Sequence, residues 1–386
     1  MKPKLFRVTT ISGSLKLLKG QYRFMSDHGF EVIGISSKGR HLDDIRKDEE
    51  IRTIALEMTR TISLLRDLKS LFQFYKICKK ERPLIVHTHT PKAGIVGMLG
   101  AKLAGVPIRL HTVAGLPLVE SSGIKRKILD FVERLTYSCA SKIYPNSKKM
   151  YEFIIKNNYT SKGKLEVIAN GSSNGIDTQF FSPDKITEEK KSLLKRKLNI
   201  SDSDFVLIFV GRIVGDKGIN ELVQAFVELN NPQMKLLLVG SQEKELDPLK
   251  KETLIALEKN KNILSVGFQD DVRPYFAISK ALVFPSYREG FPNVVMQAGA
   301  MEVPSIVSDI NGCNEIIVSG ENGIVIPVKN TEELKKSITT LFKNNVLYNK
   351  LKSNCRRMIV NRYEQRIIWG ALLREYQTFL KQHSKE

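Results

Sequence analysis

Short apolar segments alternate with longer helical segments along this chain, and the alternation runs through two successive blocks. Short apolar runs separated by helical spans are typical of parallel strands whose sheet is covered by helices on both faces. The pattern therefore predicts an α/β chain with two doubly wound domains in series. In the first block the expected strands are Leu5–Ile11, Glu31–Ser36, Leu84–His87, Ile108–Val113, Lys142–Pro145 and Lys164–Ile168, with helical segments at Ser14–His28 and Ser63–Lys80. In the second block the expected strands are Phe205–Val210, Lys235–Val239, Ile263–Gly267, Ala281–Phe284 and Ser305–Val307.

The length of 386 residues agrees with two domains, each large enough for its own core. A proline-bearing stretch, Gln179–Asp184, separates the two blocks. We therefore expect a first domain over residues 1–180 and a second over residues 181–364. Residues 365–386 are expected to form a closing helix with no strand after it, because their apolar residues recur at helical spacing. These residues are Ile368, Leu372, Leu373, Tyr376 and Leu380.

The composition describes a soluble globular protein, with 42% hydrophobic and 26% charged residues. Four cysteines are scattered without a C-x-x-C pair, so neither a disulfide framework nor a zinc site is indicated. No apolar run approaches the ~20 residues of a membrane span. The chain begins directly with a strand and carries no signal-peptide pattern, so we expect it to be cytoplasmic.

The formal net charge of +20 suggests an anionic partner, although a lysine-rich background composition would also account for it. The basic residues are dispersed, and the aromatic residues, 8% of the chain, form no stacking series among them. We therefore expect no nucleic acid. An anionic membrane surface and phosphorylated small molecules stay as candidates.

Two loops that follow apolar strands and lead into helices carry the chemically informative residues. The loop Val210-Gly-Arg-Ile-Val-Gly-Asp-Lys-Gly-Ile219 places Arg212 and Lys217 among glycines. The loop in Ser286-Tyr-Arg-Glu-Gly-Phe-Pro-Asn-Val-Val-Met-Gln-Ala-Gly-Ala-Met301 runs through Gly and Pro into a helix of small and apolar residues. Free backbone N–H groups at a helix start attract anions. Together with two fixed cations, they predict a site for an anionic ligand.

Over nearly its whole length the chain resembles glycosyltransferase family 4, in the style of bacterial capsule and lipid-linked polysaccharide enzymes. The resemblance is carried, in family order, by His87-Thr-His-Thr-Pro-Lys-Ala-Gly94, Asn170-Gly-Ser-Ser-Asn-Gly-Ile-Asp-Thr-Gln-Phe-Phe181, Gly211-Arg-Ile-Val-Gly-Asp-Lys-Gly218, Glu289-Gly-Phe-Pro-Asn293 and Glu321-Asn-Gly-Ile-Val-Ile-Pro327. It implies the GT-B architecture, in which two Rossmann-like domains face a cleft and the C-terminal helix returns to the first domain. The first domain would bind the acceptor, and the second the nucleotide-sugar.

The same resemblance implies a retaining hexosyltransferase of surface polysaccharide biosynthesis. The donor would be a nucleotide-diphosphate sugar, expected to be a UDP-sugar. The acceptor would be a saccharide or a polyprenyl-diphosphate-linked saccharide.

The resemblance assigns catalytic roles to Arg212, Lys217 and Glu289. Cleavage of a sugar–diphosphate bond builds negative charge on the leaving phosphate, and stabilising developing charge is usually the largest catalytic effect. Arg212 and Lys217 would stabilise that charge, and Glu289 would lie near the donor sugar. Where the family usually has a second glutamate, this chain has Gln297. Its amide keeps an acceptor oxygen for the ribose hydroxyls but loses the charge that strengthens such hydrogen bonds.

Further donor-binding residues follow from the resemblance. The backbone N–H groups around Pro292 would hold the sugar hydroxyls and the diphosphate, although Pro292 and Asn293 also fit a plain helix start. The expected donor-binding residues, besides Gln297, are Gly13, Gly211, Phe268, Phe291, Pro292, Asn293 and Val294. Phe268 lies in the loop expected to hold the base, and Gly13 lies in a Ser-Gly-Ser turn where a missing side chain allows close approach to the ligand.

The acceptor-side candidates are His89, Lys92 and His111. The family's cleft histidine has no counterpart, because Ala114 stands in its place. His89 and His111 are the nearest substitutes, although a lone histidine is more often a satisfied structural group.

We expect neither a metal nor a cofactor. His87-Thr-His89 lacks a third ligand at a plausible spacing. Asp202-Ser-Asp204 matches the D-x-D pattern of metal-dependent glycosyltransferases, but its place before a strand favours turn chemistry. Arg212 and Lys217 would neutralise a diphosphate without a cation.

Two helical segments combine an apolar stripe with basic residues. One stripe contains Leu64, Leu68, Leu71, Phe72 and Tyr75, and the other Ile124, Ile128, Val132 and Leu135. Each fits a packed helix with a solvated basic face, or a surface that rests on anionic lipid. For a lipid-linked acceptor we expect peripheral contact with the inner face of the plasma membrane.

Other functions stay open at this stage. A UDP-sugar 2-epimerase shares the two-domain architecture but needs proton-abstracting carboxylates beside the sugar. A non-catalytic nucleotide- or carbohydrate-binding protein would agree with Gln297 and Ala114. A nicotinamide dehydrogenase is disfavoured, because no G-x-G-x-x-G follows a strand.

Overall fold

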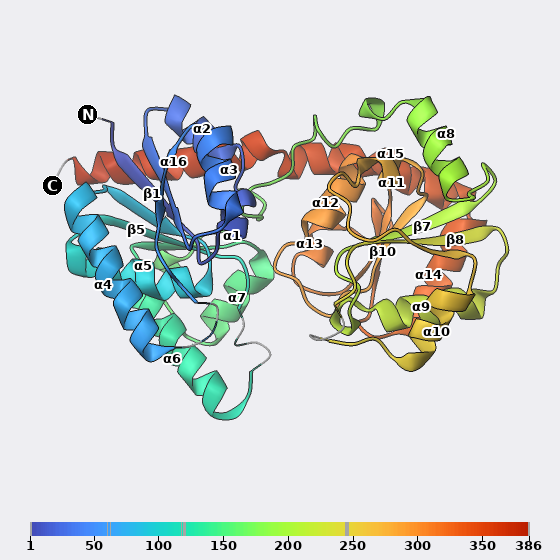
Figure 1. Cartoon of the computed structure of the whole chain (residues 1–386), viewed down its shortest axis with the longest axis horizontal. Helices are drawn as coiled ribbons and strands as arrows, with labels where there is room; N and C mark the ends of the chain where they lie inside the picture. The colour runs from blue at the N-terminus through green and yellow to red at the C-terminus, as the bar shows by residue number, and fades with distance from the viewer. Residues whose placement is uncertain are drawn as a thin grey trace. The chain divides into compact units, whose positions relative to one another are not determined.

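The computed structural model describes residues 2–384 except 60, 62, 117, 119–120 and 244–246. These residues divide into two compact units, one with the chain up to Gly175 together with the chain from Arg366 on, and the other with Ile176–Gln365. The described part of each unit holds one six-stranded sheet, ordered β3-β2-β1-β4-β5-β6 in the first and β12-β11-β10-β7-β8-β9 in the second (Figure 1). All strand pairs within them are parallel. The prediction of two doubly wound parallel sheets is confirmed.

The first unit alternates strands and helices. Its strands are β1 (Lys4–Val8), β2 (Glu31–Ser36), β3 (Arg52–Ala55), β4 (Ile85–Thr88), β5 (Ile108–Val113) and β6 (Lys142–Pro145). Its helices are α1 (Ser12–Lys16), α2 (Gln21–Asp27), α3 (Arg40–Asp48), α4 (Leu64–Glu81), α5 (Pro91–Ala104), α6 (Gly123–Cys139), α7 (Lys148–Lys156) and α16 (Gln365–His383), with a 3₁₀ turn at Lys162–Lys164.

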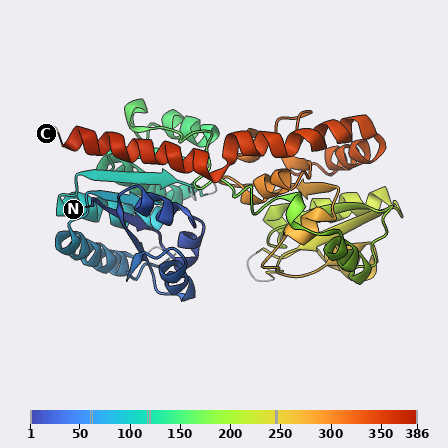
Figure 2. The same cartoon turned by 90° about the horizontal axis from the view of Figure 1, so that it is seen from above.

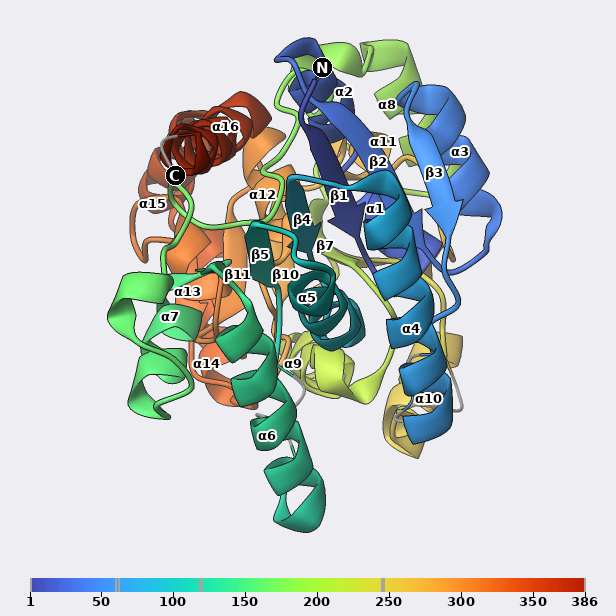
Figure 3. The same ribbon diagram turned by 90° about the vertical axis from the view of Figure 1, so that its left-hand side faces the viewer.

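Successive side chains of a strand point to opposite faces of the sheet, and in the first unit each face is covered by its own apolar core. Phe6 of β1 joins a core that includes Phe74 of α4 and Tyr137 of α6. The preceding residue, Leu5, joins a second core that includes Tyr22 of α2 and Ile368 of α16. Figure 3 shows α4, α5 and α6 side by side, and Figure 2 shows α16 running along this unit.

The second unit repeats the arrangement. Its strands are β7 (Phe205–Val210), β8 (Met234–Val239), β9 (Ile263–Ser265), β10 (Ala281–Phe284), β11 (Ser305–Ser308) and β12 (Gly323–Ile326). Its helices are α8 (Glu188–Lys197), α9 (Ile219–Leu229), α10 (Lys251–Lys259), α11 (Arg273–Ala277), α12 (Asn293–Ala300), α13 (Cys313–Ile316), α14 (Thr331–Lys343) and α15 (Asn345–Tyr363), with 3₁₀ turns at Pro183–Lys185 and Gly215–Lys217. A single apolar core runs through the unit, so the loops at the strand ends rest on a rigid base.

Two predicted elements differ from the structure, and two strands were not predicted. The expected strand Lys164–Ile168 is wrong: a 3₁₀ turn occupies Lys162–Lys164, and only Leu165 bridges to Ile143 of β6. The expected helix Ser14–His28 is divided into α1 and α2 at Gly20, whose φ is 84°. A Cβ at Gly20 would lie 2.5 Å from the ring of Trp369, so the break makes room for α16. The edge strand β3 was not predicted because its sequence, Arg-Thr-Ile-Ala, contains no continuous apolar run. The edge strand β12 was also not predicted, although its sequence, Gly-Ile-Val-Ile, is apolar.

The chain passes from the first unit to the second after Gly175, five residues before the expected boundary at 180. Ile176 donates its N–H to Tyr363 O (2.8 Å) and accepts from Gln365 N–H (3.1 Å), which ties residues 176–180 to the second unit. The chain from Arg366 on belongs to the first unit, as expected for a helix that returns there.

A buried hydroxyl fastens α16 to the first sheet. Tyr376 is fully buried, and its hydroxyl accepts a hydrogen bond from Arg7 Nη1 (3.0 Å). The same hydroxyl lies 2.6 Å from Nδ1 of His87. The Tyr376 hydroxyl oxygen is therefore hydrogen-bonded both to Arg7 of β1 and to His87 of β4, so it joins α16 to two strands of the sheet.

We predict that Tyr376→Phe destabilises the first unit by about 2–4 kcal/mol, because a buried guanidinium N–H and an imidazole nitrogen both lose their partner. The measurement is the urea unfolding midpoint of the full chain. Thr378→Ala, an exposed position on the same helix, is the matched control and should change stability by less than about 0.5 kcal/mol. Equal stability of the two variants would show that the buried hydroxyl contributes nothing.

Candidate active site

Glycines shape the two loops of the second unit that follow β7 and β8. Gly218 has φ 71°, and a Cβ there would lie 2.2 Å from Pro285 O at the end of β10. Gly240 has φ 151°, and a Cβ there would lie 1.7 Å from Gly211 O. Only glycine fits both positions, and its absence of a side chain brings the loops after β7, β8 and β10 together.

Lys217 and Glu289, predicted from separate motifs, form an ion pair in this unit. Lys217 ends the 3₁₀ turn after β7, and Glu289 lies in the loop between β10 and α12. The distance from Lys217 Nζ to Glu289 Oε1 is 2.6 Å, and the side chains are only 15% and 17% exposed. Ser286 Oγ donates to the same carboxylate oxygen at 3.0 Å. Both predicted catalytic groups are therefore fixed at the carboxyl edge of the sheet.

Cys313 is buried next to this pair. Burial raises the pKa of its thiol well above the ordinary value, and the Glu289 carboxylate adds to that effect while Lys217 opposes it. The thiol is therefore protonated at neutral pH, and we assign it no nucleophilic role.

Arg212 lies on the same loop as Lys217 but has a different partner. Its Nη1 is 3.0 Å from Glu243 Oε2, a residue after β8, and both side chains are partly exposed. Because this pair is more open to water than the pair of Lys217 and Glu289, its counterion can be exchanged at lower cost.

A cavity of about 300 Å³ opens beside Arg212 at the carboxyl ends of β7, β8 and β9. Its lining is mainly apolar and includes the predicted residues Gly211, Arg212 and Phe268, together with Gly240 and Gln269. The Phe268 side chain is 70% exposed, so its ring is free to cover a planar ligand. An apolar slot with a cation at its rim suits a base attached to phosphate.

The remaining donor-side candidates lie at the start of α12. This helix begins at Asn293, directly after Pro292, so the N–H groups of Asn293 and Val294 are in the first turn, where no intrahelical acceptor is available. The ring of Phe291 packs edge-on against Tyr363, at 5.4 Å between centroids, and fixes the loop. Gln297 follows one turn later, and its side-chain amide has no hydrogen-bond partner among the described residues.

In the first unit, His89 and His111 are both buried. His89 Nε2 accepts a hydrogen bond from Arg7 Nε at 3.1 Å, and burial holds the pKa of His89 well below the ordinary value. His111 Nδ1 lies 2.7 Å from Thr88 Oγ1, and burial lowers its pKa to about 4. The His111 ring packs against Gly94, where a Cβ would lie 2.6 Å from it. We therefore interpret His111 as a packing residue, neutral above about pH 4.

Lys92 and Gly13 are placed differently from what their predicted roles suggest. Lys92 forms a partly buried ion pair with Asp67 of α4, so its ammonium already has a counterion. Gly13 is not in an open turn but in the first turn of α1, with ordinary φ and no atom closer than 3.7 Å to an added Cβ. Packing within the unit therefore does not require glycine at this position.

The family resemblance also places Gly240 and Glu243, which follow the expected strand Lys235–Val239, near the donor site, and the structure has both beside Arg212. Arg7 was not identified from the motifs. Arg7 carried a usable signal, since it is the one charged residue inside the apolar run Leu5–Val8. A charge at such a position is buried in a parallel sheet and needs partners.

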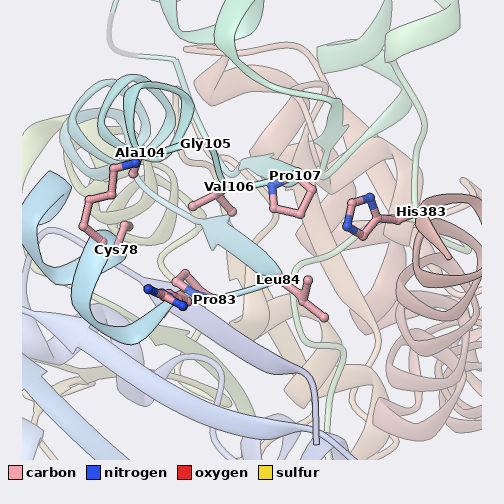
Figure 4. A pocket seen from close by; sticks show the side chains of 10 residues that line it. Cys78, Pro83, Leu84, Ala104, Gly105, Val106, Pro107 and His383 are labelled. Carbon is pink, nitrogen blue, oxygen red and sulfur yellow. The ribbon is translucent and has the colours of Figure 1, made fainter. Parts of the chain in front are cut away.

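A larger cavity, of about 510 Å³, lies away from the predicted residues. It is lined by the amino ends of β4 and β5 and the end of α16, with Cys78, Pro83, Val106 and His383 among its residues (Figure 4). Burial raises the pKa of Cys78 to about 12, so its thiol is inert. None of the predicted site residues lines this cavity, and we assign it no substrate.

Within the described ranges, no cluster of three or more His, Cys, Asp or Glu residues is arranged to hold a metal ion. Among the helices described, none has the length and apolarity needed to cross a bilayer.

The chain matches two family profiles in tandem. Residues 20–171 match the glycosyl transferase 4-like domain, and residues 190–358 match glycosyl transferases group 1.

The chain is also similar to curated relatives over nearly their whole length. The capsular polysaccharide biosynthesis glycosyltransferase CapM of Staphylococcus aureus is 34% identical over 383 residues, which covers 98% of either chain. The UDP-Gal:alpha-D-GlcNAc-diphosphoundecaprenol alpha-1,3-galactosyltransferase of Escherichia coli is 29% identical, with 91% of this chain and 90% of that protein covered. The N,N'-diacetylbacillosaminyl-diphospho-undecaprenol alpha-1,3-N-acetylgalactosaminyltransferase of Campylobacter jejuni is 27% identical, with 92% and 93% covered.

Solved structures share the fold. A glycosyltransferase from Rickettsia africae superposes with a TM-score of 0.83 at 21% identity, covering 98% of this chain and 99% of that one. HepE from Anabaena, in complex with UDP, superposes with a TM-score of 0.81 at 17% identity, covering 97% and 100%. The expected GT-B fold is thereby confirmed.

We predict that Gly240→Ala destabilises the second unit far more than Gly267→Ala. Both glycines have positive φ, but an added Cβ meets Gly211 O at 1.7 Å in the first case and nothing within 4 Å in the second. Gly267→Ala should cost about 1 kcal/mol from backbone strain alone. The measurement compares the urea unfolding midpoints of the two variants. Similar midpoints would mean that the loops after β7 and β8 are not in close contact.

Proposed function

Because this chain belongs to the group 1 glycosyl transferases of the capsule and lipid-linked polysaccharide type, we propose that it takes its sugar from a UDP-sugar and transfers it, with retention, to a polyprenyl-diphosphate-linked saccharide. The observation that carries this proposal is the ion pair of Lys217 with Glu289, at 2.6 Å, together with Arg212 on the same loop as Lys217. Lys217 and Arg212 are two cations beside an apolar slot, and each can exchange its carboxylate partner for a diphosphate.

The donor proposal draws support from the slot and from the neighbours. The slot of about 300 Å³ takes the uracil, with Phe268 over the base. Gln297 of α12, which lies outside the lining of the slot, accepts from the ribose hydroxyls. HepE, the Anabaena neighbour, was solved with UDP and also with UDP-glucose. Arg212 and Lys217 exchange their carboxylate partners for the diphosphate, whose charge they can match.

In the proposed transfer the bond between the anomeric carbon and the diphosphate oxygen breaks, and a bond from that carbon to the acceptor hydroxyl oxygen forms. The hydroxyl proton passes to the leaving phosphate oxygen, on the face where the diphosphate departs. Negative charge on that oxygen rises as the bond breaks, and Arg212 and Lys217 stabilise it more in the transition state than in the bound substrate. No metal is needed for this neutralisation.

Glu289 positions groups in this scheme and forms no bond to the sugar. Its carboxylate accepts from Ser286 Oγ and holds the Lys217 ammonium at the carboxyl edge of the sheet until the diphosphate takes its place. The first-turn N–H groups of α12 add donors to the same anion.

A lipid-linked acceptor is supported by the relatives and by the surface of the first unit. The Escherichia coli and Campylobacter jejuni relatives are named for acceptors carried on diphosphoundecaprenol. The helices α4 and α6 expose large apolar side chains near their amino ends: Leu64, Leu65, Leu68 and Phe72 on α4, and Ile124, Ile128 and Phe131 on α6. Exposed Lys69, Lys76, Lys79, Lys80, Lys125 and Lys127 lie on the same helices. We propose that this apolar and basic surface rests on anionic lipid at the inner face of the plasma membrane.

We predict that replacing Arg212 and Lys217 together by alanine lowers kcat/KM at least 10²–10³-fold, since loss of one charge-stabilising contact typically costs ~3–4 kcal/mol of barrier. The measurement is release of UDP from a UDP-sugar with a membrane extract as the source of acceptor. The double variant Arg196→Ala with Lys343→Ala removes the same charges from exposed positions on α8 and α14 and should keep full activity.

Turnover at the unaltered rate in the Arg212 and Lys217 variant would refute the assignment. Formation of an epimerised UDP-sugar without any acceptor would indicate a 2-epimerase instead.

We predict that the chain sediments with vesicles of anionic lipid at low salt and is released at high salt, since each basic residue near the headgroups contributes ~1 kcal/mol. Changing Leu65, Phe72 and Phe131 to serine should abolish binding. Serine at Leu193 and Val346, which are also exposed but lie in the second unit, should leave binding unchanged. Equal binding by both variants would place the contact elsewhere, and no binding by the unaltered chain would reject it.

A further inference from the structure

Arg7 is a fully buried cation in the first sheet whose hydrogen-bond partners are all neutral. Its Nε donates to His89 Nε2 (3.1 Å), Nη1 to the Tyr376 hydroxyl (3.0 Å), and Nη2 to Gln21 Oε1. The buried carboxylate of Glu49 accepts instead from the backbone N–H groups of Gly20 and Arg23. A guanidinium has only donors, so it fixes the direction of every hydrogen bond that starts from it.

This direction fixes the tautomer of His89. Since Nε2 accepts from Arg7, Nε2 carries no proton, and a neutral imidazole must carry its proton on Nδ1. Burial keeps the ring neutral by holding the pKa of His89 well below its ordinary value. His89 is only 5% exposed, and its Nδ1 has no partner among the described residues. His89 therefore presents a buried N–H donor without an acceptor, polarised by the cation behind it.

A second chain of hydrogen bonds runs in the same direction. Because the Tyr376 hydroxyl accepts from Arg7, its own proton points to His87 Nδ1 at 2.6 Å. His87 then carries its proton on Nε2 and donates to Thr112 Oγ1 at 2.7 Å. Since Thr112 Oγ1 accepts there, its hydroxyl proton is available to donate onward.

Both series of hydrogen bonds, the one through His89 and the one through Tyr376 and His87, end at one small cavity of the first unit. His89 and Thr112 line it, together with Asn146, Ser172 and Tyr144, at the carboxyl ends of β4, β5 and β6. Its volume of about 10 Å³ admits one water-sized group. Asn146 is 4% exposed; its Nδ2 donates to Ala114 O (3.2 Å), and its Oδ1 has no partner among the described residues. The residues that line the cavity thus supply two polarised donors and one acceptor without a partner among the described residues.

We propose that this cavity is a subsite for one hydroxyl group of the acceptor saccharide, with His89 and Thr112 donating to the hydroxyl oxygen and Asn146 Oδ1 accepting its proton. The inference rests on the proposed glycosyl transfer and names the group of the acceptor that this unit recognises.

A hydroxyl fits better than a phosphate oxygen. A phosphate oxygen would accept from His89 and Thr112 but would be repelled by Asn146 Oδ1, whereas a hydroxyl satisfies all three atoms. An oxygen that accepts two cation-polarised hydrogen bonds also loses electron density, so it is a poor nucleophile. The bound hydroxyl therefore anchors the acceptor, and the reacting hydroxyl is another one.

The test is nitrogen-15 NMR of the histidine rings in the full chain, which has six histidines. We expect His89 to be the Nδ1–H tautomer and its resonance to move saturably with the methyl glycosides of glucose, galactose or N-acetylglucosamine. Inorganic phosphate should not move it. Thr112→Val and Asn146→Leu should each weaken the response about tenfold, the loss expected for one buried hydrogen bond. His28, an exposed ring next to Phe24, is the internal control and should not respond.

Arg7 acts through His89 and is a positioning residue, so its test is the tautomer. Arg7→Lys removes the Nε donor, and we expect His89 to shift toward the Nε2–H form. Should that variant fail to fold, the tautomer in the unaltered chain decides. An Nε2–H form there, a response to phosphate rather than glycosides, or no response to any of these probes would overturn the subsite.

A thermal shift with UDP separates this inference from the proposed function. Stabilisation by UDP with no glycoside response at His89 would leave the donor assignment intact and remove the subsite. A glycoside response without stabilisation by UDP would keep the subsite and remove the donor assignment.

Discussion

Both sheets of this chain are wholly parallel, and the positions of the chemically active residues depend on that constraint. A parallel sheet buried on both faces gathers every strand-to-helix loop at one edge, where polar side chains reach solvent and ligands. In the second unit this edge holds Arg212, the cavity beside Phe268 and the pair of Lys217 with Glu289. In the first unit the same edge holds His89 and Asn146, which follow β4 and β6. The fold thus explains why residues far apart in sequence share one chemistry in each unit.

The two units use cations in opposite ways. Arg212 and Lys217 face carboxylates and keep some contact with solvent, so an incoming diphosphate can replace those carboxylates. Arg7 is fully buried and bonded to neutral groups, so it cannot exchange partners without breaking the attachment of α16 through Tyr376. Its charge acts instead through directed hydrogen bonds, which orient His87 and His89. An exchangeable cation suits a substrate that arrives charged, and a fixed cation suits the orientation of a neutral hydroxyl.

The sequence predicted the parts of this molecule that local pattern determines. Apolar runs located most strands, and glycine-framed motifs located Lys217 and Glu289, whose contact depends only on two loops that follow adjacent strands. Pattern failed where tertiary packing decides. The break at Gly20 exists because Trp369, far along the chain, needs the space, and Lys92 is held by Asp67 of a different helix. The roles of Thr112 and Asn146 could not be predicted, because they follow from hydrogen-bond directions that start at Arg7 and pass through Tyr376 of the last helix.

The same parallel topology relates the acceptor subsite to the lipid surface proposed for the first unit. A helix that connects parallel strands begins at the carboxyl edge of the sheet and runs back toward the other edge. The exposed apolar residues of α4 and α6 lie in the first halves of those helices, which is the half near that edge. The small cavity lined by His89 and Thr112 lies at the same edge. The subsite lies on the face of the sheet that α16 covers, with Ile368 and Leu372 in its lining, whereas α4 and α6 cover the other face. An acceptor anchored by its lipid at α4 and α6 would therefore reach the subsite across the edge that the two faces share.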